Sequence, residues 1–161
     1  MEEELDSLVR EFFRVFDNRN KCKPDFAMLQ SVCAEGAVIA KRTAESMEIG
    51  SLAEFWRPRQ AFLTDGSLTD FHEWEVASET TICGGIATRI CRYKKEGLLR
   101  GESYSGSGTK FMHFVLTQEG WKITAVLWED EDERLPAKKL QRYGSGAIDG
   151  MHQDVATESL P

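Results

Sequence analysis

The chain has 161 residues, of which 41% are hydrophobic and 29% charged, and its formal net charge is -7. This length fits one globular domain with a sizeable core. Phosphate backbones and anionic lipid headgroups repel an acidic surface, so we expect neither a nucleic-acid partner nor a membrane partner. No apolar run is long enough to span a bilayer.

Cysteine usage predicts the redox compartment. The four cysteines, Cys22, Cys33, Cys83 and Cys91, stand far apart without a CxxC pair, and the chain opens with Met1 and three glutamates rather than with a basic and then apolar signal region. These features predict reduced thiols and a cytoplasmic location. The cysteines and histidines lack the spacing of a zinc site, and we expect neither a metal nor a cofactor.

Three helices are predicted before residue 65. Apolar residues recur every three or four positions over residues 3–17, which indicates a first amphipathic helix. Pro24 favours the start of a second helix, which Gly36 is expected to end. Ser51 and Glu54 have the spacing of a capping box and begin a third helix, in which an interior proline is expected to cause a kink or a restart.

Strands dominate the remainder of the domain. A short strand is expected at residues 37–40 and a polar loop at 43–48, and longer strands are predicted at 71–83, 86–94, 102–117 and 121–130. After Pro136 the periodicity stops. We therefore divide the chain into a domain over residues 1–135 and a flexible tail over 136–161.

Glycines indicate a turn and a bulge in these strands. The pair at 84–85 suits a two-residue hairpin with positive φ at both positions. Without a bulge, this turn places Glu79 opposite Ile90 and Glu75 opposite Lys94. Two further glycines, at 106 and 108, predict a bulge that bends the sheet.

The best-patterned segment is 110–132, predicted as two antiparallel strands joined at 118–120. Its apolar residues fall on both alternating faces, so we expect helices to cover one face and a second subunit the other. The face assigned to the interior carries Phe111, His113, Val115, Ile123 and Leu127, with His113 opposite Ala125. The face assigned to a homodimer mate carries Met112, Phe114, Val126 and Trp128.

The order helix, helix, strand, helix and four-stranded meander resembles the cone-shaped α+β fold of the nuclear transport factor 2-like superfamily. The resemblance covers residues 3–132 and is closest to uncharacterised bacterial members. It rests on the segments FFRVFDNR (12–19), SLAEFWRPRQAFLTDGSLTDFHEWE (51–75), GGIATRICRYKKEG (84–97) and GWKITAVLWEDED (120–132). It implies three N-terminal helices packed on a strongly curved, mostly antiparallel sheet.

Members of this superfamily include isomerases, dehydratases, polyketide cyclases and binding modules, so the resemblance leaves the chemistry open. In the ketosteroid isomerase branch a carboxylate base follows the first strand, where this sequence has Lys41. A tyrosine of the first helix donates to the enolate oxygen in that branch, where this sequence has Phe12, Phe13 and Phe16. Isomerase chemistry of that kind is therefore disfavoured.

Our first hypothesis is that the cone binds a small, mostly apolar molecule. The candidate ligand-binding residues are aromatic, basic or apolar side chains placed by the strand and helix patterns: Trp56, Arg59, Phe62, Arg89, Tyr93, His113 and Leu127. Such aromatic residues can equally belong to an ordinary core. A cone filled by them would favour another hypothesis, a protein-interaction or dimerisation module.

A further hypothesis is an enzyme of the isomerase, dehydratase or cyclase kind. The candidate catalytic residues are His113 as general base, Glu129 as the carboxylate beside it, and Arg89 or Tyr93 as the donor to an oxyanion. Structural roles remain open for the same residues. A buried or interface histidine can be satisfied by one hydrogen bond, and Arg89 can form an ion pair, for example with Glu73.

Overall fold

The computed structural model describes residues 1–131 and 139–142. In this part of the chain, three α-helices and one short 3-10 helix accompany a six-stranded sheet. The elements are α1 (Glu2–Arg14), η1 (Arg19–Lys21), α2 (Phe26–Val32), β1 (Cys33–Arg42), β2 (Met47–Ser51), α3 (Leu52–Thr64), β3 (Leu68–Cys83), β4 (Ile86–Leu99), β5 (Glu102–Thr117) and β6 (Gly120–Asp130).

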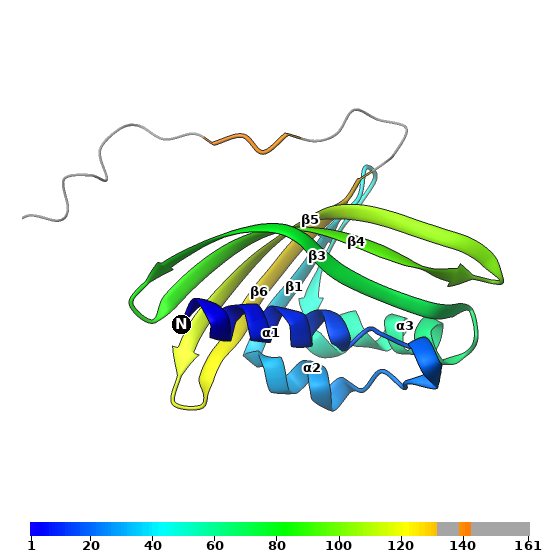
Figure 1. Ribbon diagram of the computed structural model, residues 1–161, viewed down its shortest axis with the longest axis horizontal. Helices are drawn as coiled ribbons and strands as arrows, with labels where there is room; N and C mark the ends of the chain where they lie inside the picture. The colour runs from blue at the N-terminus through cyan, green and yellow to red at the C-terminus, as the bar shows by residue number, and fades with distance from the viewer. Residues whose placement is uncertain (132–138, 143–161) are drawn as a thin grey trace, which may run out of the picture.

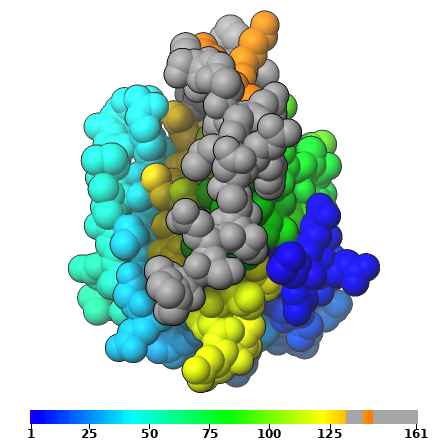
Figure 2. All heavy atoms as spheres, turned by 90° about the vertical axis from the view of Figure 1, so that its left-hand side faces the viewer, coloured from blue at the N-terminus to red at the C-terminus, as the bar shows by residue number. Residues whose placement is uncertain are grey.

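All three α-helices lie on one side of the strongly curved sheet (Figure 1). The strand order is β2-β1-β6-β5-β4-β3, and every neighbouring pair is antiparallel except β1 and β6. Figure 2 shows the end of the molecule where the start of α1 (blue) and the β1–β2 side (cyan) flank the turn between β5 and β6 (yellow). The predicted α+β cone is confirmed.

The helices follow their predicted apolar patterns, with shifted ends. Helix α1 ends at Arg14, and α2 begins after Asp25, whose side chain accepts a hydrogen bond from the backbone N–H of Ala27 at 2.9 Å. Helix α2 already ends at Val32. Gly36, predicted to end it, lies instead in β1 with φ +76°, where the pairing of β1 with β6 is irregular.

The capping box of α3 is confirmed. The Ser51 hydroxyl accepts from the backbone N–H of Glu54 at 3.3 Å, and the Glu54 carboxylate accepts from the backbone N–H of Ser51 at 2.7 Å. The helix runs through Pro58 as one element. The prediction of a loop at 43–48 is wrong at its end, because Met47–Ser51 pairs with β1 as a short edge strand, and its five mostly exposed residues are too few to give a clear strand pattern.

The β3–β4 hairpin turns at 84–85 as predicted, with positive φ at Gly84 alone of the two glycines. Glu79 pairs with Ile90, which confirms that part of the register. Glu75 pairs with Tyr93 rather than with the predicted Lys94, because Val76 is an extra residue in β3. This bulge turns the Glu75 side chain to the same face as Tyr93.

The pairing of β4 with β5 runs without a shift, so the bulge predicted at glycines 106 and 108 is absent from that ladder. These glycines serve close packing instead. A Cβ atom at Gly108 would lie 2.5 Å from the hydroxyl of Tyr93 and 2.5 Å from the carbonyl oxygen of Glu129. The missing side chain therefore provides the space in which the Tyr93 ring lies across β5.

A second bulge decides the faces of the β5–β6 hairpin. His113 pairs with Ala125, as predicted, but Phe114 pairs with Ile123, so Thr124 is an extra residue in β6. Residues on both sides of the bulge, Ile123 and Val126, are therefore buried together, at 0% and 1% exposure.

The predicted face assignment is wrong apart from Ile123. Met112, Phe114, Val126 and Trp128 lie on the inner face, defined as the face that the helices cover. Phe111, His113 and Leu127 lie on the outer face and are exposed. The reason is the β4–β5 register, which pairs Phe114 with Ala87 and Met112 with Arg89, both buried residues of the inner face of β4.

The predicted tail, 136–161, lies outside the described residues except for 139–142. All four cysteines are unpaired. No helix in the described part of the chain is long and apolar enough to cross a membrane. The cytoplasmic location stays a prediction.

We predict that Gly108→Ala destabilises the fold by about 1 to 3 kcal/mol, because its new methyl group must displace the Tyr93 ring or the backbone of β6. The measurement is the urea unfolding midpoint by circular dichroism. Gly85→Ala is the matched control, since its Cβ atom would meet only the Cβ atom of Leu116 at 3.6 Å. Equal midpoints for the two variants would contradict the prediction.

Candidate functional site

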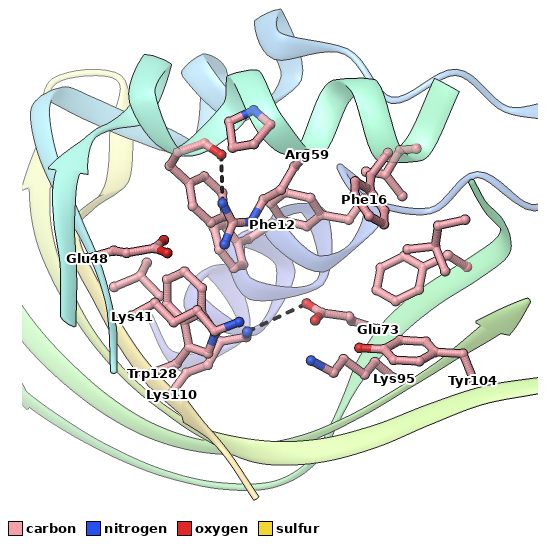
Figure 3. A pocket seen from close by; sticks show the side chains of 17 residues that line it. Phe12, Phe16, Lys41, Glu48, Arg59, Glu73, Lys95, Tyr104, Lys110 and Trp128 are labelled. Carbon is pink, nitrogen blue, oxygen red and sulfur yellow. Dashed lines mark hydrogen bonds and ion pairs between the residues drawn. The ribbon is translucent and has the colours of Figure 1, made fainter. Parts of the chain in front are cut away.

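A cavity of about 400 Å³ lies between the helices and the inner face of the sheet (Figure 3). Aromatic side chains from helices and strands form much of its wall: Phe12, Phe16, Phe55, Phe62, Phe71, Tyr104 and Trp128. Six charged side chains also line it: Lys41, Glu48, Arg59, Glu73, Lys95 and Lys110. An apolar wall with a few placed polar groups is typical of a small-molecule site.

Lys110 is the most buried of these charges. Strand alternation places it on the inner face between Gly108 and Met112, and its side chain is only 5% exposed. Its ammonium nitrogen lies 3.8 Å from the centroid of the Tyr93 ring and 3.6 Å from a carboxylate oxygen of Glu73. Burial lowers the pKa of Lys110, and the charge of Glu73 opposes this only in part.

Asp130, at the end of β6, holds a cluster of donors beside the cavity. One carboxylate oxygen accepts hydrogen bonds from the Tyr93 hydroxyl and from the Lys95 ammonium, the latter at 2.9 Å. The other oxygen lies 3.3 Å from the Lys41 ammonium. Burial by itself would raise the pKa of Asp130, but the charge of Lys95 and the hydrogen bonds lower it from 3.8 to about 2.

The partners of Asp130 are perturbed in return. For Lys95, burial favours the neutral amine, yet the charge of Asp130 and the hydrogen bond to it raise the pKa above its usual value. Burial and the charge of Asp130 both raise the pKa of Tyr93. At neutral pH the cluster therefore contains a protonated Tyr93 phenol and the Lys95 ammonium group beside the Asp130 carboxylate.

Arg59 enters the cavity from α3. Its guanidinium donates to the backbone carbonyl of Phe55 at 2.8 Å and lies 3.7 Å from the centroid of the same residue's ring. The Trp128 ring centroid is 5.4 Å away. Burial lowers the pKa of Arg59 and outweighs the attraction of nearby carboxylates. No carboxylate of the described residues lies within 4.0 Å of its nitrogens.

Arg89 lies away from this cavity, between α1 and the sheet. Its guanidinium donates to both carboxylate oxygens of Glu75, at 2.5 and 2.9 Å, to Asp6 at 2.7 Å and to Thr80 at 3.1 Å. The structure thus contains the ion pair left open as an alternative, with Glu75 and Asp6 in place of Glu73. The bulge at Val76 explains the change of partner.

Three of the candidate catalytic residues, His113, Glu129 and Arg89, are not brought together. His113 is exposed on the outer face, and Glu129 pairs with Arg42 at 3.0 Å. Arg89 is on the inner face and 5% exposed. None of the three lines the 400 Å³ cavity. A catalytic role for them stays a prediction without support from their placement.

Some of the candidate ligand-binding residues line the cavity and others do not. Arg59 and Phe62 line the cavity. Tyr93 lies next to it through its contacts with Lys110 and Asp130. Trp56, at 4% exposure, packs in the core without reaching the cavity. Leu127, like Arg89 and His113, lies elsewhere.

Comparisons with known proteins identify the architecture. No protein-family model matches the chain, and none of the curated proteins is similar to it in sequence. An NTF2-like protein with a cystatin-like fold from Novosphingobium aromaticivorans superposes with a TM-score of 0.64 and 18% identity, over 82% of each chain. The chain has the nuclear transport factor 2-like fold.

Two further solved structures share this NTF2-like fold. A superfamily protein from Salmonella enterica has a TM-score of 0.64 and 14% identity, and the match covers 89% of this chain and 96% of the other. A protein from Kribbella flavida has a TM-score of 0.68 and 16% identity, covering 81% and 90%. Identities at this level concern the fold, so function is argued from the site itself.

Sequence reasoning missed most charged residues of the cone in this NTF2-like fold. Those are Lys41, Glu48, Glu73, Lys95, Lys110 and Asp130. One signal was present: Lys110 alternates with Met112 and Phe114, which are apolar and buried. A lysine in phase with a buried strand face indicates a charge directed into the core. No group of three or more histidine, cysteine or acidic side chains in the described residues is arranged to hold a metal ion.

We predict that Asp130 stabilises the fold in a pH-dependent way. Its folded-state pKa is lowered from 3.8 to about 2, so its contribution is complete above pH 4 and is lost as the pH falls through 2. We expect Asp130→Asn to cost about 1 to 2 kcal/mol at pH 7, allowing for the partly exposed side chain. Unfolding free energies of both proteins should converge between pH 4 and pH 2.

The control for this titration is Glu119→Gln, which removes a carboxylate that is 83% exposed. That variant should follow the wild-type pH profile. If Asp130→Asn were as stable as the wild type at pH 7, the proposed role of this carboxylate would be excluded.

Proposed function

We propose that the cone binds a small, mostly apolar molecule. The observation that carries this proposal is the cavity of about 400 Å³, a volume in the range of small-molecule sites. It opens between helices and sheet, where the aromatic rings of α1 and α3 face Trp128 and Tyr104 (Figure 3). A cavity of this size favours a binding protein over a module whose cone is filled by its own side chains.

The enzyme hypothesis receives less support. A general base and an oxyanion donor must both reach one substrate. His113 and Arg89 lie on opposite faces of the sheet, so one molecule in the cone cannot contact both. A binding role for the cone requires no such convergence.

We predict that the neutral dye N-phenyl-1-naphthylamine binds with saturable fluorescence enhancement, because its aromatic rings match the walls of the cavity. Leu68→Trp, which places a larger ring at the cavity wall, should weaken binding at least tenfold. Leu98→Trp is the control, since Leu98 is 37% exposed and does not line the cavity. Unchanged dye binding by Leu68→Trp would exclude the cone as the site.

Native mass spectrometry of the purified protein would reveal a copurifying ligand.

We also propose that two copies associate through the outer face. A row of apolar side chains crosses five neighbouring strands at paired positions of this face: Ile49, Ala40, Leu127, Phe111 and Ile90. Ile49, Leu127 and Phe111 are 62%, 44% and 42% exposed in the single chain. Ala40, between Ile49 and Leu127, is only 9% exposed, so the exposed apolar side chains of the row lie on both sides of it. Exposed apolar side chains grouped in this way are typical of protein interfaces.

The neighbouring rows make this surface suitable for self-association. On one side of the apolar row, Arg42, Glu129 and Thr109 are paired across the strands. The other side carries His113 and Thr88, together with the apolar Val38 and Ala125. At the β3 edge, Glu79 forms an ion pair with Arg142. A polar rim around an apolar centre is the usual arrangement of an interface that buries itself against a second copy.

We predict that light scattering at micromolar concentration gives twice the 18.2 kDa chain mass. Leu127→Asp should produce monomers, because it places a charge in the middle of the apolar row. Leu116→Asp is the control, since Leu116 is 45% exposed but lies outside that row. A monomeric wild type would contradict the proposed association.

A further inference from the structure

The cavity contains the buried ammonium group of Lys110, for which no hydrogen-bond acceptor is found among the described residues. Lys110 carries three N–H donors, yet its nearest described carboxylate oxygen, on Glu73, is 3.6 Å away. Its other close neighbours are the faces of Tyr93 and Trp128, at 3.8 and 5.1 Å. A buried cation without acceptors is costly, so an acceptor supplied by a ligand would be strongly favoured.

Arg59, on the opposite wall of the cavity, also has fewer hydrogen-bond acceptors than donors. Only one of its five N–H donors makes a hydrogen bond within the described residues, to the backbone carbonyl of Phe55. The guanidinium descends from α3 toward the sheet, and the Lys110 side chain rises from β5 toward it (Figure 3). Both cationic groups lie near one ring, because Trp128 is 5.4 Å from the first and 5.1 Å from the second.

The charges around the cavity do not balance. Among the described residues, four basic side chains line it, and Asp130 and the two glutamates of the wall supply three carboxylates. Asp130 is occupied by Lys41 and Lys95, and Glu73 is nearest to Lys110. One positive charge is therefore in excess.

This balance restricts the charge of a ligand. A cation would add to the excess, and a dianion such as a phosphate ester would bring a second negative charge close to Glu48 and Glu73. A neutral molecule could supply an acceptor oxygen but would leave the excess positive charge without a counter-charge. One negative charge with two oxygen atoms satisfies both requirements, since a carboxylate matches the planar fork of a guanidinium.

We propose that the cone is a site for a small aromatic or branched aliphatic carboxylate, whose carboxylate group lies between Arg59 and Lys110. Its apolar body lies against the aromatic rings of the wall, of which Phe55 and Trp128 flank the charged end. This proposal rests on the proposed binding function of the cone and adds the charge and chemical class of the ligand.

The test compares two probes of nearly equal shape, 2-naphthoate and the neutral 2-naphthamide, by titration calorimetry at pH 7. We expect the wild type to bind the carboxylate at least tenfold more tightly than the amide, because only the carboxylate neutralises the excess charge. Lys110→Met and Arg59→Met should each reduce this preference to near unity while retaining affinity for the amide. Retained amide binding also demonstrates that a variant is folded.

Matched controls lie on the same elements or their neighbours. Arg57→Met changes an exposed arginine of α3, and Lys94→Met changes an exposed lysine of β4. Neither residue lines the cavity, and both variants should keep the wild-type preference. If they lost it as well, net charge rather than the cavity would cause the effect, and the proposal would be wrong.

The remaining outcomes separate this proposal from the one on which it rests. If the wild type bound both probes equally, or the amide alone, the carboxylate site would be excluded and the cone would remain a binding site for neutral molecules. A preference that survived in Lys110→Met and Arg59→Met would place the anion elsewhere and overturn the assignment. If neither naphthalene compound nor N-phenyl-1-naphthylamine bound, both proposals would fail.

Discussion

The fold and its site depend on how one hairpin presents its side chains to the helices. Strict alternation along β6 would put Ile123 and Val126 on opposite faces of the sheet. The extra residue Thr124 brings both to the inner face, where they pack with Met112 and Phe114 at 2% exposure or less. This one irregularity makes the apolar inner face continuous from Ile123 to Trp128, and Val126 and Trp128 also line the cavity.

The cavity combines aromatic side chains with six charged ones. Bringing Lys95 out of water is costly, and two features of the sheet reduce the cost. Asp130 accepts from Lys95 and Tyr93 together, so one carboxylate compensates several donors. Glycines 106 and 108 leave space on the inner face, into which the side chains of Lys95 and Tyr93 fit without clashes. The same sheet thus carries an apolar core and a polar chamber.

A protein whose cone is filled by its own side chains would lack this cavity. NTF2-like folds support many activities because the cone can be lined with different groups while the helices and sheet stay the same. Here the interior offers aromatic walls and cations, whereas the histidine and glutamate that appeared catalytic in the sequence lie on the outside. His113 and Glu129 flank the apolar row of the outer face, whereas the inward-facing charges line the cavity.

Local patterns in the sequence were sufficient for the helices, the capping box at Ser51, the hairpin turn at Gly84 and the pairing of His113 with Ala125, because each depends on neighbouring residues. They also indicated the NTF2-like architecture. The faces could not be derived in this way, since one extra residue at Val76 or Thr124 reverses every side chain beyond it, and a bulge leaves little trace in composition. The partners of Arg89 and the meeting of Arg59 with Lys110 across the cavity depend on contacts between residues far apart in the chain. These contacts are determined only by the tertiary structure, in which the curved sheet brings distant parts of the chain together.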